Sequence, residues 1–265
     1  MTIRVAIAGP RGKMGSEAVH TVMNNDHMEL VAVLDHREIA NSLDCYTEFP
    51  NSYRVPVYRN LEDLFETVKP DVFVDLTAPD VVYKHTKEAL QYGVRPVIGT
   101  TGFTDNQLEE LTELSANLQL GAIIAPNFAI GAVLMMKFSQ MAAAYLPEVE
   151  IIEMHHDRKL DAPSGTAIKT AQLIQENRRS HKQGHPDEDE TLPGARGANF
   201  EGLRIHSVRL PGLVAHQQVL FGGEGQLLTL RHDSFNRTSF MSGVKFSIEK
   251  VMELDELVYG LENIL

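Results

Sequence analysis

The chain of 265 residues contains very little cysteine and no excess of positive charge. Cys45 is its single cysteine, so no disulfide can form within the chain, and we expect a reducing compartment. The formal net charge at pH 7 is −12. We therefore expect neither nucleic acid nor an anionic membrane as the main partner, although a local group of cations can still bind a small anion.

Long apolar segments are missing as well. No apolar run approaches the about 18–20 residues that cross a bilayer, so the sequence predicts no membrane span. The first apolar run, Ile3–Ala8, is too short for a signal peptide and leads directly into a fold motif, so we expect no secretory leader. These absences favour a cytoplasmic protein. The chain also lacks internal repeats and low-complexity segments.

The first 35 residues combine a strand, a glycine-rich turn, a helix and a second strand that ends in an acid. Ile3–Ala8 favours a short strand, and Gly9–Gly15 follows it with the spacing G-x-x-G-x-x-G. Ser16–Met23 has helical spacing, and the next apolar run, Leu30–Leu34, ends at Asp35. In such a turn the first glycine permits a tight bend, the second admits a pyrophosphate, and the third lets helix pack on strand.

Asp35 lies 20 residues after Gly15, where an acid can accept a hydrogen bond from the ribose of an adenosine. The turn and this acid together predict a Rossmann-like dinucleotide site, although the usual spacing is G-x-G-x-x-G. A glycine turn of purely structural value in another α/β protein is the alternative.

Strand-like and helical runs alternate through the first half of the chain, which predicts an α/β fold with a doubly wound parallel sheet. The expected strands are Val72–Leu76, Val97–Ile98 and Gly121–Ala125, and the expected helices are Val82–Tyr92 and Asp105–Leu118. Ligands of such sheets bind at the carboxyl ends of the strands. Three of these ends are polar or rich in glycine: Gly9–Gly15, Gly99–Thr101 and Ala125–Phe128.

The pattern changes in the second half. A helix is expected over Gly131–Tyr145, and strands then follow without intervening helices at Ile205–Leu210, Gln217–Phe221 and Leu227–Arg231. This order predicts a second, α+β domain with an open mixed sheet, of which one face packs on helices and the other can pair with another subunit. The charged stretch Arg178–Glu190 is interpreted as a solvated loop, and Ser242–Leu265 as helical.

These patterns divide the chain into two predicted domains. We assign residues 1–126 and 237–265 to the dinucleotide-binding domain, and residues 127–236 to a domain for substrate binding and oligomerisation.

The segment Glu153–Ala167 contains the densest group of candidate catalytic residues. His155 is a possible general acid, His156 is a second imidazole, and Lys159 adds positive charge. Pro163–Thr166 favours a turn that opens a helix, whose free backbone N–H groups bind carboxylate or phosphate. The segment therefore predicts a site for an anionic substrate that receives a proton. A polar loop before a helix is the structural alternative.

These motifs together resemble the 4-hydroxy-tetrahydrodipicolinate reductase (dihydrodipicolinate reductase) family, and the resemblance covers essentially the whole chain. It is carried by Gly9–Gly15, Val97–Phe103, Ala125–Phe128 and, above all, Glu153–Ala167. The resemblance implies a cytoplasmic homotetramer of two-domain subunits. It also implies that NADH or NADPH reduces a cyclic dicarboxylic imine to tetrahydrodipicolinate, a step of lysine and diaminopimelate biosynthesis.

Residue roles follow from the matching positions. His155 resembles the proton donor and Lys159 its catalytic partner, while substrate carboxylates are assigned to His156, Ser164, Gly165 and Thr166. No metal ligand is implied. The cofactor contacts implied are Gly9, Pro10, Arg11, Gly12, Lys13, Met14, Asp35, His36, Gly99, Thr100, Thr101, Ala125, Pro126, Asn127 and Phe128.

The choice between NADH and NADPH stays open. Many relatives carry an arginine directly after the ribose acid, where this chain has His36, with Arg37 next. An imidazole clamps a 2′-phosphate less well than a guanidinium, and Asp35 would repel that phosphate. Arg11 or Lys13 can compensate, so we predict that both cofactors are used.

Two other classes share parts of this pattern. A different nicotinamide oxidoreductase, such as a semialdehyde dehydrogenase, needs a cysteine nucleophile, and Cys45 is badly placed for that role. A non-catalytic dinucleotide-binding redox sensor would not require His155 and Lys159 together.

Overall fold

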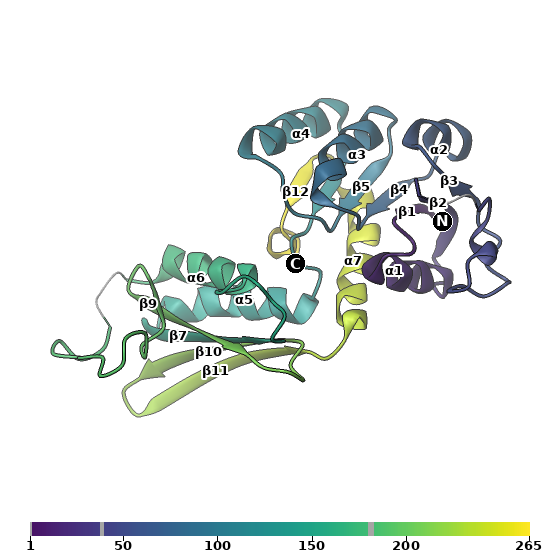
Figure 1. The fold of residues 1–265 in the computed structure, drawn as a ribbon. Coiled ribbons are helices and arrows are strands. Elements are labelled where there is room, and N and C mark those ends of the chain that lie inside the picture. The colour runs from purple at the N-terminus through teal and green to yellow at the C-terminus, as the bar shows by residue number, and fades with distance from the viewer. Residues whose placement is uncertain (1, 38–39, 180–182) are drawn as a thin grey trace. The chain divides into compact units, whose positions relative to one another are not determined.

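The computed structural model describes residues 2–37, 40–179 and 183–265. The chain forms two compact units, of which unit 1 is Met1–Phe128 with Phe240–Leu265 and unit 2 is Ala129–Ser239. Each unit contains one β-sheet with helices packed against it (Figure 1).

The sheet of unit 1 has seven strands in the order β12-β6-β5-β4-β1-β2-β3, and all neighbours are parallel. Its strands are β1 (Ile3–Ala8), β2 (Met28–Leu34), β3 (Val57–Tyr58), β4 (Val72–Asp75), β5 (Arg95–Ile98), β6 (Ala122–Ile124) and β12 (Leu257–Tyr259). The chain runs from β1 outward to β3 and then returns to the other side of β1. This reversal makes the carboxyl ends of β1 and β4 the switch point of the sheet, which is where such folds bind their ligands.

Helices cover both faces of this sheet, as Figure 1 shows. One face carries α2 (Leu61–Val68), α3 (Pro79–Gln91) and α4 (Asp105–Leu118), and the other carries α1 (Lys13–Met23) and α7 (Met241–Lys250). The alternation of strand side chains sends Ala6 and Ala8 toward the first face, where they pack with Leu64, Phe65 and Phe73. The predicted fold class is thereby confirmed for the first half of the chain.

One prediction about secondary structure was wrong. The expected helix over Ser242–Leu265 ends at Lys250, and β12 and two short 3₁₀ turns follow it. β12 pairs with the exposed edge of β6, and Gly260, at a φ of 88°, donates its N–H to Ile124. Sheet pairing therefore overrides the helical pattern there.

The stretch Arg178–Glu190 agrees with the predicted solvated loop, because its described residues 178–179 and 183–190 form no helix or strand and most are exposed; residues 180–182 lie outside the described residues. Arg178 is buried, and its Nε donates to the Pro147 carbonyl at 2.6 Å.

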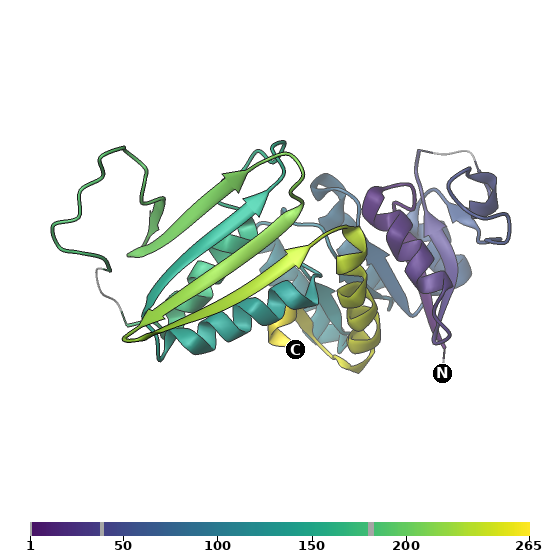
Figure 2. The same cartoon turned by 90° about the horizontal axis from the view of Figure 1, so that it is seen from below.

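The sheet of unit 2 has five strands in the order β11-β10-β7-β9-β8, with β7 and β9 parallel and the other neighbours antiparallel. Its elements are α5 (Ile130–Ala143), β7 (Glu148–His155), α6 (Gly165–Asn177), β8 (Ala198–Phe200), β9 (Leu203–Arg209), β10 (Ala215–Gly223) and β11 (Gln226–Ser234). Both helices lie on one face of the sheet (Figures 1 and 2). No helix within the described part of unit 2 covers the other face, so the predicted open mixed sheet is confirmed.

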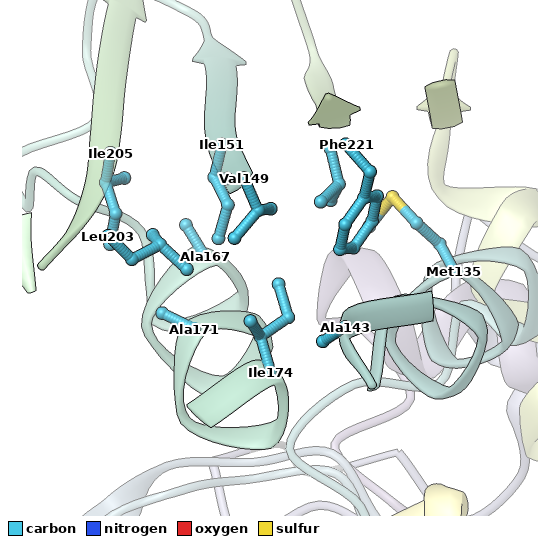
Figure 3. Close-up of a cluster of buried hydrophobic side chains, with 11 residues drawn as sticks. Met135, Ala143, Val149, Ile151, Ala167, Ala171, Ile174, Leu203, Ile205 and Phe221 are labelled. Carbon is cyan, nitrogen blue, oxygen red and sulfur yellow. The ribbon is translucent and has the colours of Figure 1, made fainter. Parts of the chain in front are cut away.

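The inward-facing side chains of β7 change from apolar to polar along the strand. Val149 and Ile151 pack with Phe221 of β10 and with Ala171 and Ile174 of α6 in an apolar core (Figure 3). The next inward positions are Glu153 and His155, because alternate residues of a strand share a face. The apolar core thus supports a polar group at one end of the same strand.

Among the described residues, no helix is long and apolar enough to cross a membrane.

Candidate active site

The predicted dinucleotide turn joins β1 to α1. Gly9 has a φ of +73°, and Gly12 is the N-cap of α1 without any side-chain cap. A Cβ at Gly15 would lie 2.0 Å from the Gly9 carbonyl oxygen, so only glycine lets the helix start this close to the turn. The absent side chains leave a cradle in which backbone N–H groups at the helix start can face a pyrophosphate, so the turn fits the predicted cofactor.

The segment after β4 lies beside this turn. A Cβ at Gly9 would lie 3.1 Å from Thr77 Cγ2. Buried Asp75 holds Thr77 in place by accepting hydrogen bonds from its N–H at 2.8 Å and its hydroxyl at 2.5 Å. The other Asp75 oxygen lies 2.7 Å from His85 Nδ1. Sequence reasoning did not select these residues, because only the strand order places Thr77 beside Gly9.

The two other predicted cofactor segments lie side by side. Strands β5 and β6 are neighbours, and the Ala125 N–H donates to the Ile98 carbonyl at 2.8 Å. A Cβ at Gly99 would lie 2.5 Å from the Phe128 ring, so glycine is required for this approach. The predicted cofactor segments Gly9–Met14, Gly99–Thr101 and Ala125–Phe128 therefore share the carboxyl edge of the unit 1 sheet.

Asp35, at the end of β2, is bound by the Arg11 guanidinium. Arg11 Nε and Nη2 donate to the two Asp35 oxygens at 2.6 and 3.1 Å, and the same guanidinium lies over the Tyr46 ring. Burial alone would raise the pKa of Asp35, but the bonds from the Arg11 side chain and the Arg37 backbone outweigh it and lower the pKa. The acid predicted to meet the ribose and the cation predicted to meet a phosphate therefore form one ion pair.

His36 directly follows Asp35 in the chain. It lines a pocket of about 490 Å³ together with Arg59, Lys84 and His85. Arg59 and Lys84 supply the cationic side chains of this pocket, which lies next to the position expected to meet an adenosine.

In unit 2, His155 is bound to a buried carboxylate. Its Nδ1 lies 2.5 Å from Glu153 Oε2, and Arg209 donates to both Glu153 oxygens at 2.7 and 2.8 Å. Burial alone would raise the pKa of Glu153, but hydrogen bonds from His155, Arg209 and Ser207 outweigh it and lower the pKa to about 2. Glu153 is therefore an anion at any pH near neutrality.

The predicted anion-binding turn, Pro163–Thr166, lies at the start of α6, and we call it the anion nest. Ser164 is its N-cap, since the Ser164 hydroxyl accepts the Ala167 N–H at 3.2 Å. The Ser164 N–H donates to Glu153 Oε1 at 3.2 Å, so this predicted substrate contact is buried and engaged within the protein. Gly165 is exposed, and a Cβ there would meet nothing within 4 Å. The open part of the nest is therefore at Gly165 and Thr166.

The remaining predicted residues lie in the turn between β7 and α6. Lys159 Nζ donates to the exposed Asp161 carboxylate at 2.8 Å. His156 Nδ1 is buried and has no hydrogen-bond partner within the described residues. A buried ring nitrogen without a partner is costly, which is consistent with a ligand group completing it.

Sequence reasoning missed two residues of this group. Glu153 could have been predicted from the sequence, because it lies two positions before His155 on one strand and therefore shares its face. Arg209 could not have been predicted in this way, because 56 residues separate it from Glu153 and only the pairing of β7 with β9 brings the two together.

Comparisons with known proteins agree with this architecture. The family model described as dihydrodipicolinate reductase, N-terminus, matches residues 3–128, and the corresponding C-terminus model matches residues 131–265. A 4-hydroxy-tetrahydrodipicolinate reductase of Lysinibacillus sphaericus is 69% identical over 265 residues, and one of Oceanobacillus iheyensis is 63% identical, with all of each chain covered.

Solved structures show the same relationship. A dipicolinate-bound dihydrodipicolinate reductase from Paenisporosarcina sp. TG-14 is 72% identical, with a TM-score of 0.93 and both chains fully covered. An amine dehydrogenase from Mycobacterium smegmatis is 13% identical with a TM-score of 0.69, covering 97% of this chain and 95% of its own, and shares the fold alone. The chain belongs to the dihydrodipicolinate reductase family, as its motifs predicted.

Proposed function

We propose that this chain reduces 4-hydroxy-tetrahydrodipicolinate (dihydrodipicolinate) to tetrahydrodipicolinate with NADH or NADPH, in lysine and diaminopimelate biosynthesis. The main support is that one carboxylate, that of Glu153, is hydrogen-bonded both to His155 and to the anion nest at the start of α6. This joins a proton donor to a carboxylate site, as reduction of a dicarboxylic imine requires. Full-length relatives with 69% and 63% identity are named for this activity.

Unit 1 binds the dinucleotide. The turn Gly9–Met14 holds the pyrophosphate, and Asp35 with Arg11 and His36 holds the adenosine ribose. The segments Gly99–Thr101 and Ala125–Phe128 would contact the nicotinamide end of the dinucleotide. When bound, the reduced nicotinamide supplies the hydride.

Unit 2 binds the substrate and supplies the proton. Gly165, Thr166 and His156 bind carboxylate oxygens, and Lys159 adds positive charge in the turn before α6. Ser164 supports this nest as its N-cap. His155 donates the proton that the reduced substrate takes up, because an imidazole exchanges protons near neutral pH.

The active form is a cytoplasmic homotetramer assembled through the open face of the unit 2 sheet. That face carries outward side chains from β7, β10 and β11, among them the apolar Ile152, Leu220 and Leu227. An uncovered sheet face with apolar side chains favours pairing with a second copy.

The function is tested by following oxidation of NADH and of NADPH by the purified protein with freshly prepared 4-hydroxy-tetrahydrodipicolinate. We expect turnover with this substrate and none with an aldehyde under the same conditions. Turnover of the aldehyde alone would favour a semialdehyde dehydrogenase, and dinucleotide binding without any turnover would favour a redox sensor.

The substrate site is tested with pyridine-2,6-dicarboxylate (dipicolinate), which is bound by the Paenisporosarcina relative. We expect inhibition that is competitive with the substrate, and a Lys159→Ala change should weaken that inhibition and lower turnover. Competition with the dinucleotide instead would place the anion site in unit 1.

A further inference from the structure

We propose that Glu153 is a positioning residue, which decides the imidazole nitrogen from which His155 delivers the proton and ties His155 to the substrate nest. The inference rests on the proposed function, in which His155 is the proton donor.

The position of Glu153 in the sheet leaves its carboxylate little freedom. Glu153 is opposite Ser207 of β9 on one side and Gln217 of β10 on the other, in the centre of the sheet. Its side chain is completely buried. The carboxylate is therefore held beside the His155 ring on the inner face of β7, with Nδ1 of that ring at 2.5 Å.

Arg209 keeps this buried carboxylate ionised. The guanidinium donates to both Glu153 oxygens, a geometry that compensates for the loss of solvent around a buried charge. An ionised carboxylate can only accept hydrogen bonds. The short bond to His155 therefore requires a proton on Nδ1, and this proton stays in place whether the ring is neutral or charged.

The nitrogen that exchanges a proton with the substrate is consequently Nε2. The imidazolium carries protons on both nitrogens and gives up the one on Nε2 to the substrate. The neutral ring that remains has its proton on Nδ1, the tautomer that Glu153 stabilises. Glu153 thus favours both states of His155 that the reaction uses and disfavours the neutral ring with its proton on Nε2.

The same carboxylate–guanidinium pair also anchors the turn that leads into α6. Glu153 Oε1 accepts the Ser164 N–H at 3.2 Å, and Arg209 Nη2 donates to the Asp161 carbonyl at 2.7 Å. The proton donor and the nest are therefore connected through a single buried ion pair. This connection fixes the spacing between the group that gives the proton and the groups that bind carboxylate.

The test is a double-mutant cycle with Glu153→Gln and His155→Gln in the full-length protein. The glutamine amide preserves shape and can still accept from Arg209, but its NH₂ group favours the wrong histidine tautomer. We expect Glu153→Gln to lower kcat by about 10²-fold, with KM and dipicolinate inhibition changed by less than about threefold. In the His155→Gln background the same change should lower the residual kcat by less than about threefold, because it acts through His155.

Glu150→Gln is the matched control. Glu150 is on the same strand and is also bound by an arginine and a histidine, Arg196 and His206, but it lies on the opposite face. Because Glu150 lies on the face proposed for assembly, the mass of this variant is first checked by light scattering, and we expect the variant of wild-type mass to keep kcat within about twofold of the wild-type value.

The possible failures can be told apart by their kinetics. An undiminished kcat in Glu153→Gln, or an equal loss of kcat in the His155→Gln background, would overturn the positioning role. A normal kcat in His155→Gln alone would instead refute the proposed proton donor. If Glu153→Gln does not fold, Glu153→Asp keeps the charge for Arg209 but shortens the reach to Nδ1. A folded Glu153→Asp protein should lose at least about tenfold in kcat, and wild-type kcat there would also overturn the proposal.

Discussion

At the scale of single residues, the chemistry of this protein depends on paired ionisable groups. Arg11 binds Asp35 in unit 1, and Arg209 with His155 binds Glu153 in unit 2. In each pair a partly or fully buried carboxylate stays ionised because a guanidinium donates to both of its oxygens. Each carboxylate therefore remains an acceptor, for the His155 imidazole in unit 2 and, as we propose, for a ribose hydroxyl in unit 1.

His155→Ala should lower kcat by about 10²–10³-fold, the usual loss when a general acid is removed, with a smaller change in KM. Steady-state kinetics with saturating NADH measures both parameters. His206→Gln is a suitable control, since His206 Nε2 also binds a carboxylate, that of Glu150, but on the other face of the sheet. Near-normal turnover in His155→Ala would exclude His155 as the donor.

Glu153 should make the stability of the protein depend on pH in a defined window. Its folded-state pKa is about 2 and its ordinary value is 4.5, so its stabilising contribution is complete above about pH 4.5 and disappears as pH falls toward 2. At neutral pH this contribution is at most about 3 kcal/mol. Urea unfolding of the wild type and Glu153→Gln should differ most near pH 7, and the difference should shrink between pH 4.5 and 3. A constant difference would contradict the lowered pKa.

The cofactor preference should be weak. Asp35 accepts from a ribose hydroxyl, whereas Arg11, already seated on Asp35, supplies charge for a 2′-phosphate. We predict that kcat/KM for NADH and NADPH differ by less than about tenfold, or about 1.4 kcal/mol. His36→Arg should shift the ratio toward NADPH, because a guanidinium binds phosphate in a bidentate manner. A wild-type ratio beyond about a hundredfold, or no shift in the variant, would mean that His36 does not face the ribose.

At the scale of elements, close backbone contacts that only glycine permits shape the cofactor site. The start of α1 touches the Gly9 turn through Gly15, and the end of β5 touches Phe128 through Gly99. Such contacts place helix and strand ends against one another without a side chain between them, which leaves backbone groups available to a ligand.

Gly15→Ala should therefore lower both the melting temperature and the affinity for NADH, because its Cβ would lie 2.0 Å from the Gly9 oxygen and force the turn apart. Thermal unfolding and titration with NADH measure the two effects. In Gly222→Ala the added Cβ would lie 3.7 Å from its nearest neighbour, an ordinary contact, so this control should change stability little. An unaltered NADH affinity in Gly15→Ala would show that the turn does not bind the dinucleotide.

At the scale of the whole molecule, the two units have different sheets, and we propose that one binds the cofactor and the other the substrate. The parallel sheet of unit 1 carries the glycine turn and the other predicted cofactor segments at its carboxyl edge, whereas the mixed sheet of unit 2 has helices on one face only. The uncovered face gives the protein a surface through which copies can associate.

Light scattering coupled to size-exclusion chromatography should give about four times the mass of one chain. Leu220→Glu, which places a charge on the uncovered face of β10, should shift the protein to smaller species. Leu118→Glu is the control, because Leu118 is an exposed residue at the end of α4 in unit 1. A wild-type protein of single-chain mass at micromolar concentration would contradict the proposed assembly.

The sequence alone predicted the features that depend on neighbouring residues. The strand, glycine turn and helix over Ile3–Met23 and the turn at Pro163–Thr166 that opens α6 follow from side-chain period and turn chemistry, which act over a few residues. These local signals, with the family resemblance, were enough to predict the fold class and to select candidate site residues.

Only the tertiary structure decided which distant segments meet. The strand order places Thr77 beside Gly9, and the pairing of β7 with β9 brings Arg209 to Glu153. Edge pairing with β6 turns Leu257–Tyr259 into a strand, although the local pattern favoured a helix. Packing between segments sets these contacts, and their free energy depends on partners that no local pattern in the sequence records.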